Sequence, residues 1–327
     1  MFLLGIESTA HTFGVGIVDE KLNILANVNS TYIPPKGKGI HPREAAIHHS
    51  ENAAEVINEA LKLANVRMKD LSAIAIALGP GLGPCLRTGA TIARFLSLQF
   101  QLPLVPVNHA VAHLEIARYA CNEEDPLVVY IAGGNTIITT FVEGRYRIFG
   151  ETQDIALGNA VDYFGRMIGV EYPELINVEK LAIEGKQLLD LPLVVKGQDV
   201  SYSGLITSAL KLIKEGYRVE DVALSFIEYA YSMLCETIER AIAYTNKKSI
   251  LLTGGTSRSI ILKEKLEKLA QGQNVSFKVV PREYAGDNGG MIALTGMLAF
   301  MHKVTIDPIR SYVKPMWRLD QVDIPWR

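Results

Sequence analysis

Apolar and polar positions in the first third of the chain follow strand-like and helical periods in turn. Two β-rich runs within residues 3–18 flank a polar turn, a pattern typical of a hairpin. Apolar residues at three- and four-residue steps predict a helix over 43–64. A short apolar run at 74–78 predicts a buried strand, and a glycine-rich loop then leads into a predicted helix at about 86–100. Strands that alternate with helices indicate an α/β protein.

The same plan returns in the second half of the chain. Apolar runs at 127–132 and 137–141, separated by a polar Gly-Gly turn, predict another hairpin. The run at 249–253 predicts a buried strand, followed by a second Gly-Gly turn and a helix over 262–270. The sequence therefore predicts two lobes of related design.

The chain length of 327 residues agrees with two lobes, because a domain commonly takes roughly 150 residues. We assign residues 1–125 to lobe I, joined by the C-terminal segment 298–327, and residues 126–297 to lobe II. Another apolar helix is predicted at about 291–301. A core helix is the favoured interpretation of its uniform hydrophobicity, and a docking surface for a partner is the alternative.

Composition excludes several classes of protein. Hydrophobic residues make up 48% of the chain and charged residues 21%, which disfavours extensive disorder. No apolar run reaches the roughly 18 residues of a membrane-spanning helix, and the first residues lack the basic start and long apolar core of a signal peptide. We expect a cytoplasmic protein with no membrane partner. The cysteines are too scattered for a disulfide framework and are expected to be reduced (Cys85, Cys121, Cys235).

The net charge is 33 − 35 = −2, so the chain as a whole carries no electrostatic footprint for nucleic acid. Any contact with RNA must be local or shared with a partner. The most basic segment is the loop at 34–43, which is either a phosphate contact or a plain solvated loop. A weaker basic segment lies in the C-terminal tail (Arg310, Lys314, Trp317, Arg318).

Three glycine-rich turns follow predicted strands, at 79–84, 133–134 and 254–255. Ligands of α/β proteins bind beyond the carboxyl ends of strands, where such turns let the backbone approach phosphates. Each turn alone could be ordinary turn chemistry, but together they favour a nucleotide cleft. The sequence contains no P-loop motif and no dinucleotide-binding motif in its usual context, which disfavours both of those chemistries.

Two histidines at a four-residue spacing are the clearest candidates for chemistry. On a helix, His109 and His113 share one face and could hold a single metal ion. The alternative is a pair of helix-face histidines with separate hydrogen bonds. A zinc peptidase needs a glutamate directly after the first histidine, and Ala110 occupies that position. Asp287, at the start of an apolar helix, is either a further ligand or part of a helix cap.

Seven motifs occur in order along the chain. They are residues 5–10 (GIESTA), 79–84 (GPGLGP), His109-x-x-x-His113, Tyr130-x-x-Gly133-Gly134-Asn135-Thr136, 159–162 (NAVD), 201–205 (SYSGL) and Asp287-Asn288. With these motifs the sequence resembles the archaeal catalytic subunit of the KEOPS complex, the tRNA N6-adenosine threonylcarbamoyltransferase, in the O-sialoglycoprotein endopeptidase-like family. The resemblance covers essentially the whole chain.

The resemblance implies a fold, a reaction and partners. The fold is that of actin, Hsp70 and sugar kinases (ASKHA), with two RNase H-like lobes around a central cleft. The reaction transfers the threonylcarbamoyl group of threonylcarbamoyl-AMP to the N6 amine of the adenosine next to the anticodon in ANN-decoding tRNAs, forming threonylcarbamoyladenosine (t6A). The implied partners are tRNA, an atypical small kinase subunit and a small dimerising subunit.

The resemblance also implies roles for individual residues. One iron or zinc ion would be held by His109, His113 and Asp287, with Tyr130 as a further, state-dependent ligand. An adenine nucleotide would bind in the cleft, where Glu7, Thr9 and Asn135 face the phosphate region. The remaining implied contacts are the adenylate-binding segment (Tyr130, Ile131, Ala132, Gly133, Gly134) and the ribose-binding acids (Asp162, Glu179).

The sequence departs from the family pattern at the adenine end of the pocket. Leu175 replaces a glycine that contacts the nucleotide, and Ser259 replaces an asparagine beside the nucleobase. These departures motivate an alternative function, a nucleotide-binding scaffold with KEOPS partners and little or no transferase activity. A sugar or carboxylate kinase on the same fold is less favoured, because such enzymes do not need a His-x-x-x-His metal pair.

Overall fold

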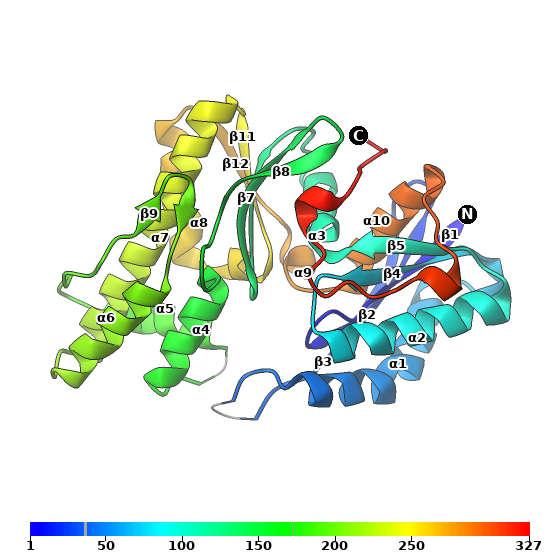
Figure 1. Ribbon diagram of the computed structural model, residues 1–327, viewed down its shortest axis with the longest axis horizontal. Coiled ribbons are helices and arrows are strands. Elements are labelled where there is room, and N and C mark those ends of the chain that lie inside the picture. Colours follow the sequence, from blue (N-terminus) through cyan, green and yellow to red (C-terminus); the bar gives the residue numbers. More distant parts are fainter. Residues whose placement is uncertain (36–37, 172) are drawn as a thin grey trace.

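The computed structural model describes residues 1–35, 38–171 and 173–327, and these residues form two lobes, each with a five-stranded sheet (Figure 1). Two positions of the predicted basic loop, residues 36–37, lie outside the described residues. No helix in the described ranges has the length and apolar character needed to cross a lipid bilayer.

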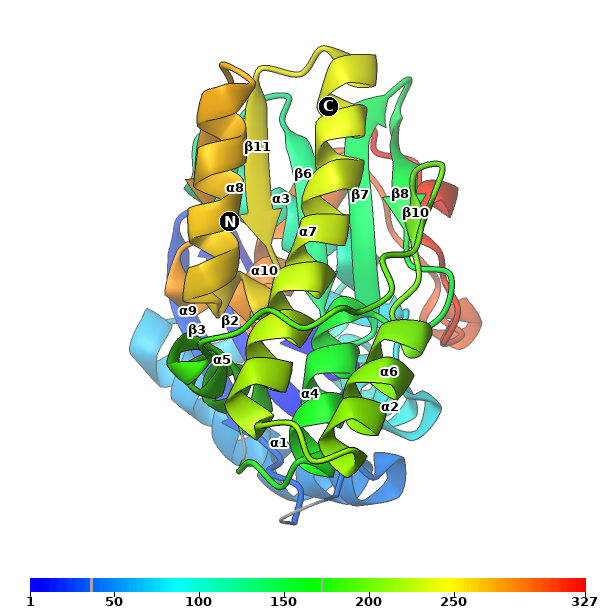
Figure 2. The ribbon, with the colours of Figure 1, turned by 90° about the vertical axis from the view of Figure 1, so that its left-hand side faces the viewer.

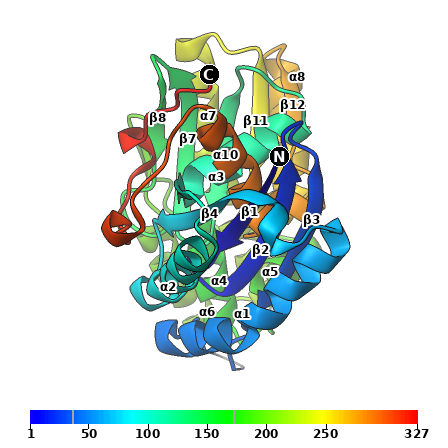
Figure 3. The same ribbon diagram turned by 90° about the vertical axis from the view of Figure 1, so that its right-hand side faces the viewer.

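The first sheet has the strand order β3-β2-β1-β4-β5. Its first three strands are antiparallel neighbours, which confirms the predicted hairpin, and β4 and β5 run parallel to β1. Helices α1 (Pro42–Ala64) and α2 (Gly83–Phe100) pack apolar side chains on one face (Figure 3). The strands are β1 (Phe2–Glu7), β2 (Thr12–Asp19), β3 (Ile24–Thr31), β4 (Leu71–Gly79) and β5 (Leu104–Asn108).

The second sheet repeats this pattern strand for strand, in the order β8-β7-β6-β11-β12. Strands β8, β7 and β6 are antiparallel, and β11 and β12 run parallel to β6. The predicted repetition of the first hairpin is therefore confirmed. The strands are β6 (Leu127–Ala132), β7 (Asn135–Val142), β8 (Arg145–Glu151), β11 (Ser249–Thr253) and β12 (Ser276–Val279).

A helical layer covers one face of the second sheet, and Figure 2 shows α7 and α8 in front of its strands. This layer comprises α4 (Leu157–Met167), α5 (Glu174–Glu184), α6 (Ser203–Lys214), α7 (Val219–Thr245) and α8 (Ile260–Gly272). Short elements connect the rest: η1 (Met68–Asp70), β9 (Val195–Lys196), β10 (Asp199–Val200), η2 (Gly255–Arg258), α9 (Arg282–Ala285), η3 (Pro308–Arg310) and η4 (Leu319–Gln321).

Helix α3 (His109–Ala120) lies between the two sheets (Figure 1). Its side chains Ala112 and Ile116 join the apolar cluster on the first sheet, whereas Leu114 and Ala117 join the cluster on the second. Because two faces of α3 pack on different sheets, its other side chains lie along the joint between the lobes. The fold thus places the predicted histidine pair where the lobes meet.

Helix α10 (Gly289–Met301) packs on the first sheet opposite α1 and α2, so the core interpretation of this apolar segment is confirmed. A Cβ on Gly289 would lie only 2.1 Å from the carbonyl carbon of Val15, and glycine is required for this close approach to β2. Residues 289–297, which the expected division assigns to lobe II, therefore lie on the first sheet. The division itself remains a prediction.

Candidate metal and nucleotide site

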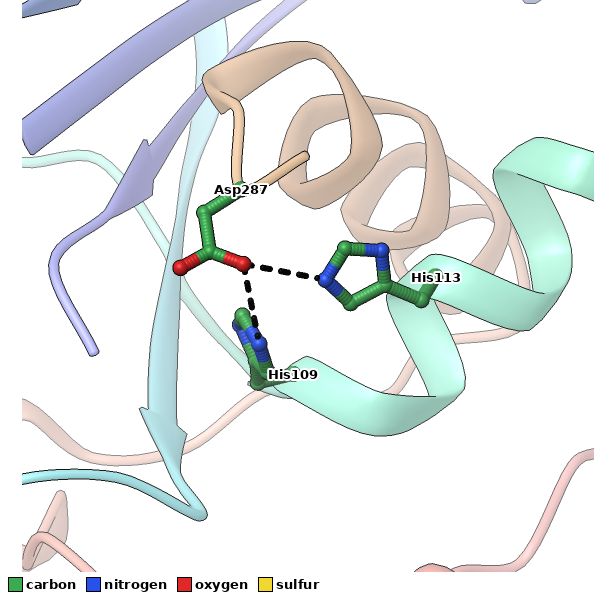
Figure 4. A group of neighbouring side chains, drawn as sticks. All are labelled: His109, His113 and Asp287. Carbon is green, nitrogen blue, oxygen red and sulfur yellow. Dashed lines mark hydrogen bonds and ion pairs between the residues drawn. The ribbon is translucent and has the colours of Figure 1, made fainter. Parts of the chain in front are cut away.

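The side chains of His109, His113 and Asp287 converge at the joint between the lobes (Figure 4). One ligand atom from each lies within 4.8 Å of the others. The Oδ1 atom of Asp287 is 3.2 Å from Nε2 of His113 and 3.5 Å from Nε2 of His109. Ligands about 2.1 Å from a tetrahedral ion lie about 3.4 Å apart, so these separations suit a shared cation.

Local helix signals position all three groups. The side chain of Asn108 accepts a hydrogen bond from Val111 N at 3.1 Å and caps α3 directly before the first histidine. The four-residue spacing then places both rings on one face, with ring centroids 4.7 Å apart. Asn288 caps α10 in the same way through Met291 N at 2.9 Å. Its neighbour Asp287 is thereby free to face the histidines, so the cap and the candidate ligand are adjacent residues.

Glu7 and Thr9 fix the orientation of His109. The Oε2 atom of Glu7 accepts a hydrogen bond from Nδ1 of His109 at 2.9 Å, while its Oε1 accepts from the backbone N of Thr9 at 2.6 Å and from the Thr9 hydroxyl at 2.5 Å. A histidine that donates through Nδ1 presents Nε2 with a lone pair to the other side. Thr9 thus holds the Glu7 carboxylate, and Glu7 in turn aims the Nε2 atom of His109 at Asp287.

Burial and charge shape the protonation of this group. Burial opposes a charge on His109, but the negative charges of Glu7 and Asp287 outweigh it and raise the pKa of His109 to about 9. Burial lowers the pKa of His113, and the neighbouring His109 adds to this effect. Burial opposes the charge of Asp287, yet both histidines hold its pKa well below the usual range. In the absence of a cation, a shared positive charge on the histidines balances the acids.

Tyr130 of β6 borders the same group. Its ring centroid is 5.2 Å from that of His113, and its hydroxyl is buried without a hydrogen-bond partner of good geometry in the described ranges. Burial raises the pKa of Tyr130 well above 10, the charges of Asp287 and Glu7 add to this, and Asn135 opposes it. A buried polar atom without a partner is costly unless a ligand completes it.

These observations fit a metal ion. Two imidazole nitrogens and one carboxylate oxygen form the donor set that zinc and non-haem iron accept. The carboxylate behind His109 and the unpartnered phenol beside His113 are features that such a site uses. The metal-holding capacity expected of His109, His113 and Asp287 is therefore confirmed as geometry, and the choice between iron and zinc remains a prediction.

The predicted adenylate segment runs from β6 into the turn before β7. Tyr130 and Ile131 are fully buried, whereas the turn is exposed. A Cβ on Gly134 would meet nothing within 4 Å, and one on Gly133 would meet only the side chain of Asn159, at 3.5 Å. Open space above a glycine turn at a strand end is the environment in which backbone can approach a phosphate. Ala132 and Asn135 flank the turn.

Asp162 lies on α4, and burial together with the nearby Glu174 raises its pKa to about 6, against the opposing effect of Arg166. Arg166 forms an ion pair with Glu174 at 3.5 Å, rather than with Asp162. A partly buried carboxyl beside another acid holds its proton more tightly than usual when the nearest cation is paired elsewhere. Within the described residues no hydrogen bond or ion pair is formed by the Asp162 carboxyl, and its role with ribose stays a prediction.

Glu179, the second predicted ribose acid, is engaged within the protein. Its Oε1 accepts hydrogen bonds from the Tyr231 hydroxyl at 2.8 Å and from the Ser259 hydroxyl, and its Oε2 accepts from Ile260 N at 3.3 Å. Ser259 also caps α8 by accepting from Leu262 N at 2.9 Å. The two departures at this end thus have local explanations: Ser259 bonds an acid and caps a helix, and the Leu175 side chain packs against the core of the second lobe.

One residue beside the site was not predicted from the sequence. His11, in the turn between β1 and β2, places its Nδ1 atom 3.9 Å from Oδ2 of Asp287. The available signal was its position four residues after Glu7, but a turn gives no fixed geometry from which to predict a contact with a residue so distant in sequence.

The architecture defines a class of protein: two lobes with the same strand pattern, joined by a helix that carries a candidate metal group, are the actin-like (ASKHA) fold. Solved structures share it. HypF of T. kodakarensis superposes with a TM-score of 0.67 at 16% identity, covering 92% of this chain and 48% of that chain. A ROK family glucokinase from Streptomyces griseus superposes with a TM-score of 0.51 at 13% identity, covering 92% and 100%. At these identities the likeness concerns the fold alone.

Within this class, the chain belongs to the tRNA N6-adenosine threonylcarbamoyltransferase family, whose family model matches residues 23–294. The protein of that name from Thermofilum pendens is 57% identical over 326 residues, which covers 99% of this chain and 97% of the relative. The protein of that name from Caldivirga maquilingensis is 52% identical, covering 100% and 98%. The family expected from the motifs is confirmed.

Proposed function

We propose that the chain carries the threonylcarbamoyl group from threonylcarbamoyl-AMP to the N6 amine of the adenosine next to the anticodon in ANN-decoding tRNAs. Family membership makes it a tRNA N6-adenosine threonylcarbamoyltransferase, which forms t6A in tRNA. The donor, the nucleotide position and the residue roles are the proposal. The observation that carries it is the convergence of His109, His113 and Asp287 at the joint between the lobes.

The reaction needs electrophilic help because an exocyclic amine conjugated to a purine is a weak nucleophile. An iron or zinc ion held by His109, His113 and Asp287 supplies a Lewis acid for the carbamoyl carbonyl. Glu7 holds His109 in the tautomer that presents Nε2, through the 2.9 Å contact at Nδ1. Tyr130 completes the group from β6 with its buried hydroxyl. Transfer forms the new carbamoyl C–N bond, breaks the bond to the phosphate oxygen, and releases AMP and the proton of the amine.

The adenylate is proposed to lie over the exposed turn between β6 and β7. Gly133 and Gly134 let the phosphate approach the backbone, because nothing close to either glycine fills the space of a side chain except Asn159. Thr9 and Asn135 face the phosphate from the two lobes. Asp162 accepts hydrogen bonds from the ribose hydroxyls through its partly buried carboxyl.

We further propose that the chain works with the KEOPS partners, an atypical small kinase subunit and a small dimerising subunit, in the cytoplasm. A net charge of −2 suits an enzyme that shares tRNA binding with other subunits. An apolar groove of about 860 Å³ between α1 and α2, bordered by the exposed Phe95, offers a surface for a protein partner.

The alternative function is a nucleotide-binding scaffold without efficient transfer. The engagement of Glu179 by Ser259 favours it, because an acid that is bonded within the protein is less available to a ribose. The alternative predicts a chain that assembles with its partners and binds nucleotide but leaves tRNA unmodified.

The test is a reconstituted transfer assay with the proposed partner subunits, tRNA, threonine, bicarbonate, ATP and the adenylate-forming enzyme. Nucleoside mass spectrometry measures t6A, and metal content is measured on the same sample. We expect the parent chain to form t6A and His109→Ala to lose both the metal and at least about 100-fold of the transfer rate. His302→Ala, at an exposed histidine, is the matched control. Full transfer by a metal-free His109→Ala contradicts the mechanism, and no t6A from the parent chain favours the scaffold.

A further inference from the structure

The two oxygens of the Asp287 carboxylate face different partners. Oδ1 lies 3.2 Å from Nε2 of His113 and 3.5 Å from Nε2 of His109, where a shared cation would sit. Oδ2 points the other way, toward Nδ1 of His11 at 3.9 Å. The carboxylate is therefore flanked by three imidazoles, of which only two face the candidate metal position.

The backbone of His11 is fixed to the first lobe, whereas its ring nitrogen Nδ1 forms no hydrogen bond within the described residues. Its backbone carbonyl accepts a hydrogen bond from Tyr32 N at 2.8 Å, which fixes the turn that follows Glu7. Its Nδ1 atom is buried, yet has no hydrogen-bond partner in the described ranges, while about 30% of the side chain is exposed. A buried nitrogen without a partner, aimed at one oxygen of a buried carboxylate, lacks only about 1 Å of approach to a hydrogen bond.

His11 does not belong to the ligand group itself. The nitrogens of His109 and His113 and the oxygen of Asp287 all lie within 4.8 Å of one another, and His11 has no atom that joins this set. Its Nδ1 atom instead approaches the oxygen of Asp287 that faces away from the other histidines, at 3.9 Å. That geometry is typical of a group that orients a ligand from behind, as Glu7 does for His109.

We propose that His11 is a positioning residue for the metal carboxylate: its Nδ1–H donates a hydrogen bond to Oδ2 of Asp287 and leaves Oδ1 as the single oxygen offered to the cation. Glu7 and His11 then act as a matched pair, one orienting a histidine ligand and the other the carboxylate ligand. Both come from the same short segment at the end of β1, so one turn of the first lobe sets the geometry of two ligands from distant parts of the chain.

The proposal rests on the proposed function only in requiring that the parent chain binds a metal ion. The test measures the affinity of the full chain for Zn²⁺ by competition with a chromogenic chelator, together with the rate at which EDTA removes the ion. His11→Phe keeps a flat ring without a donor, and we expect it to weaken binding about 10- to 100-fold and to speed removal. His11→Asn keeps an amide N–H near the position of Nδ1, and we expect its affinity to stay within about threefold of the parent.

His302→Phe is the matched control at an exposed histidine far along the chain, and we expect parental affinity from it. Thermal unfolding of the metal-free proteins separates positioning from folding, because the metal-free midpoint of His11→Phe is expected to stay near that of the parent. Parental zinc affinity in His11→Phe overturns the proposal, and so does an equal loss in His11→Asn. Absence of zinc binding by the parent chain overturns the metal-based function instead.

Discussion

The metal end and the nucleotide end of the site are built in different ways. At the metal end, Glu7, the histidine pair of α3 (His109 and His113) and Asp287 come from three distant segments of the chain, with at most 13% of any of these side chains exposed. Their polar atoms face one another within 3.5 Å. At the nucleotide end, the predicted contacts lie on an exposed turn and on two helices of the second lobe. One predicted acid there, Asp162, has a raised pKa, and the other, Glu179, is bonded inside the protein.

The difference follows from what each end must bind. A small ion requires ligands held to within tenths of an ångström, which burial and orienting hydrogen bonds provide. A nucleotide is bound through many weaker contacts. One contact residue can therefore form bonds within the protein instead, while the other contacts still bind the nucleotide. The two expected departures from the family pattern, Leu175 and Ser259, lie at the nucleotide end and not among the candidate metal ligands.

Removal of the Asp287 carboxylate should give the largest difference between metal binding and nucleotide binding. In Asp287→Ala both histidines lose the oxygen that faces them, and we expect zinc affinity and transfer rate each to fall more than about 100-fold, beyond the usual effect of a group that only orients a ligand. The dissociation constant for AMP is expected to change less than about threefold. Chelator competition, the t6A assay and calorimetric titration with AMP measure the three quantities.

Asp323→Ala is the control for this substitution, because Asp323 is an exposed aspartate whose ion pair with Arg145 lies on the surface. It should leave zinc, AMP and transfer unchanged. If Asp287→Ala weakens AMP binding as much as zinc binding, the two ends form one coupled site and the distinction drawn between them is wrong.

The same contrast explains how far the sequence could predict the molecule. Strands, helices and the histidine pair follow from local periodicity, and a four-residue spacing on a helix has only one geometry. The contact of His11 with Asp287 joins residues far apart in sequence, and it depends on how α10 sits on the first sheet. The bonds of Glu179 to Tyr231 and Ser259 depend in the same way on the packing of three helices, which no local pattern encodes.

Loss of the Glu179 charge tests the assignment at the nucleotide end. Glu179→Gln replaces a carboxylate that accepts three hydrogen bonds by an amide that can accept fewer, in a buried position. We expect the free energy of unfolding to fall by about 2–3 kcal/mol, with AMP affinity changed less than about threefold. Chemical denaturation and calorimetry check the two values.

Glu184→Gln, on the last turn of the same helix, has the same change of charge at an exposed position and serves as the control. A variant Glu179→Gln of parental stability that binds AMP ten times more weakly would instead assign this acid to the ribose, as the family pattern implies. Either result decides whether Ser259 has taken Glu179 out of ligand binding.

Replacement of Asp162 should give the smallest effect on stability, and the raised pKa of its carboxyl determines the sign of that effect. With a pKa of about 6 in the folded chain, against 3.8 ordinarily, the folded state keeps a proton that the unfolded state loses as pH rises. The contribution of Asp162 to the free energy of unfolding therefore falls between about pH 4 and pH 6 and is constant above pH 6. Asp162→Asn removes this contribution. After allowance for solvent screening, we expect the asparagine variant to be more stable than the parent by about 1–2 kcal/mol at pH 8 and by less at pH 5.

The affinity for AMP should rise with pH, whereas the contribution of Asp162 to stability falls. Ribose hydroxyls donate to the ionised carboxylate, so AMP affinity of the parent should rise severalfold between pH 5 and pH 7, while Asp162→Asn binds weakly at both values. Comparison of parent and variant at each pH cancels the titration of the buried histidines, which both share. If AMP affinity rises equally in both proteins, the pH dependence must come from a group other than the Asp162 carboxyl. Asp162 would then not belong to the nucleotide site, and the exposed glycine turn would be the main contact of the nucleotide.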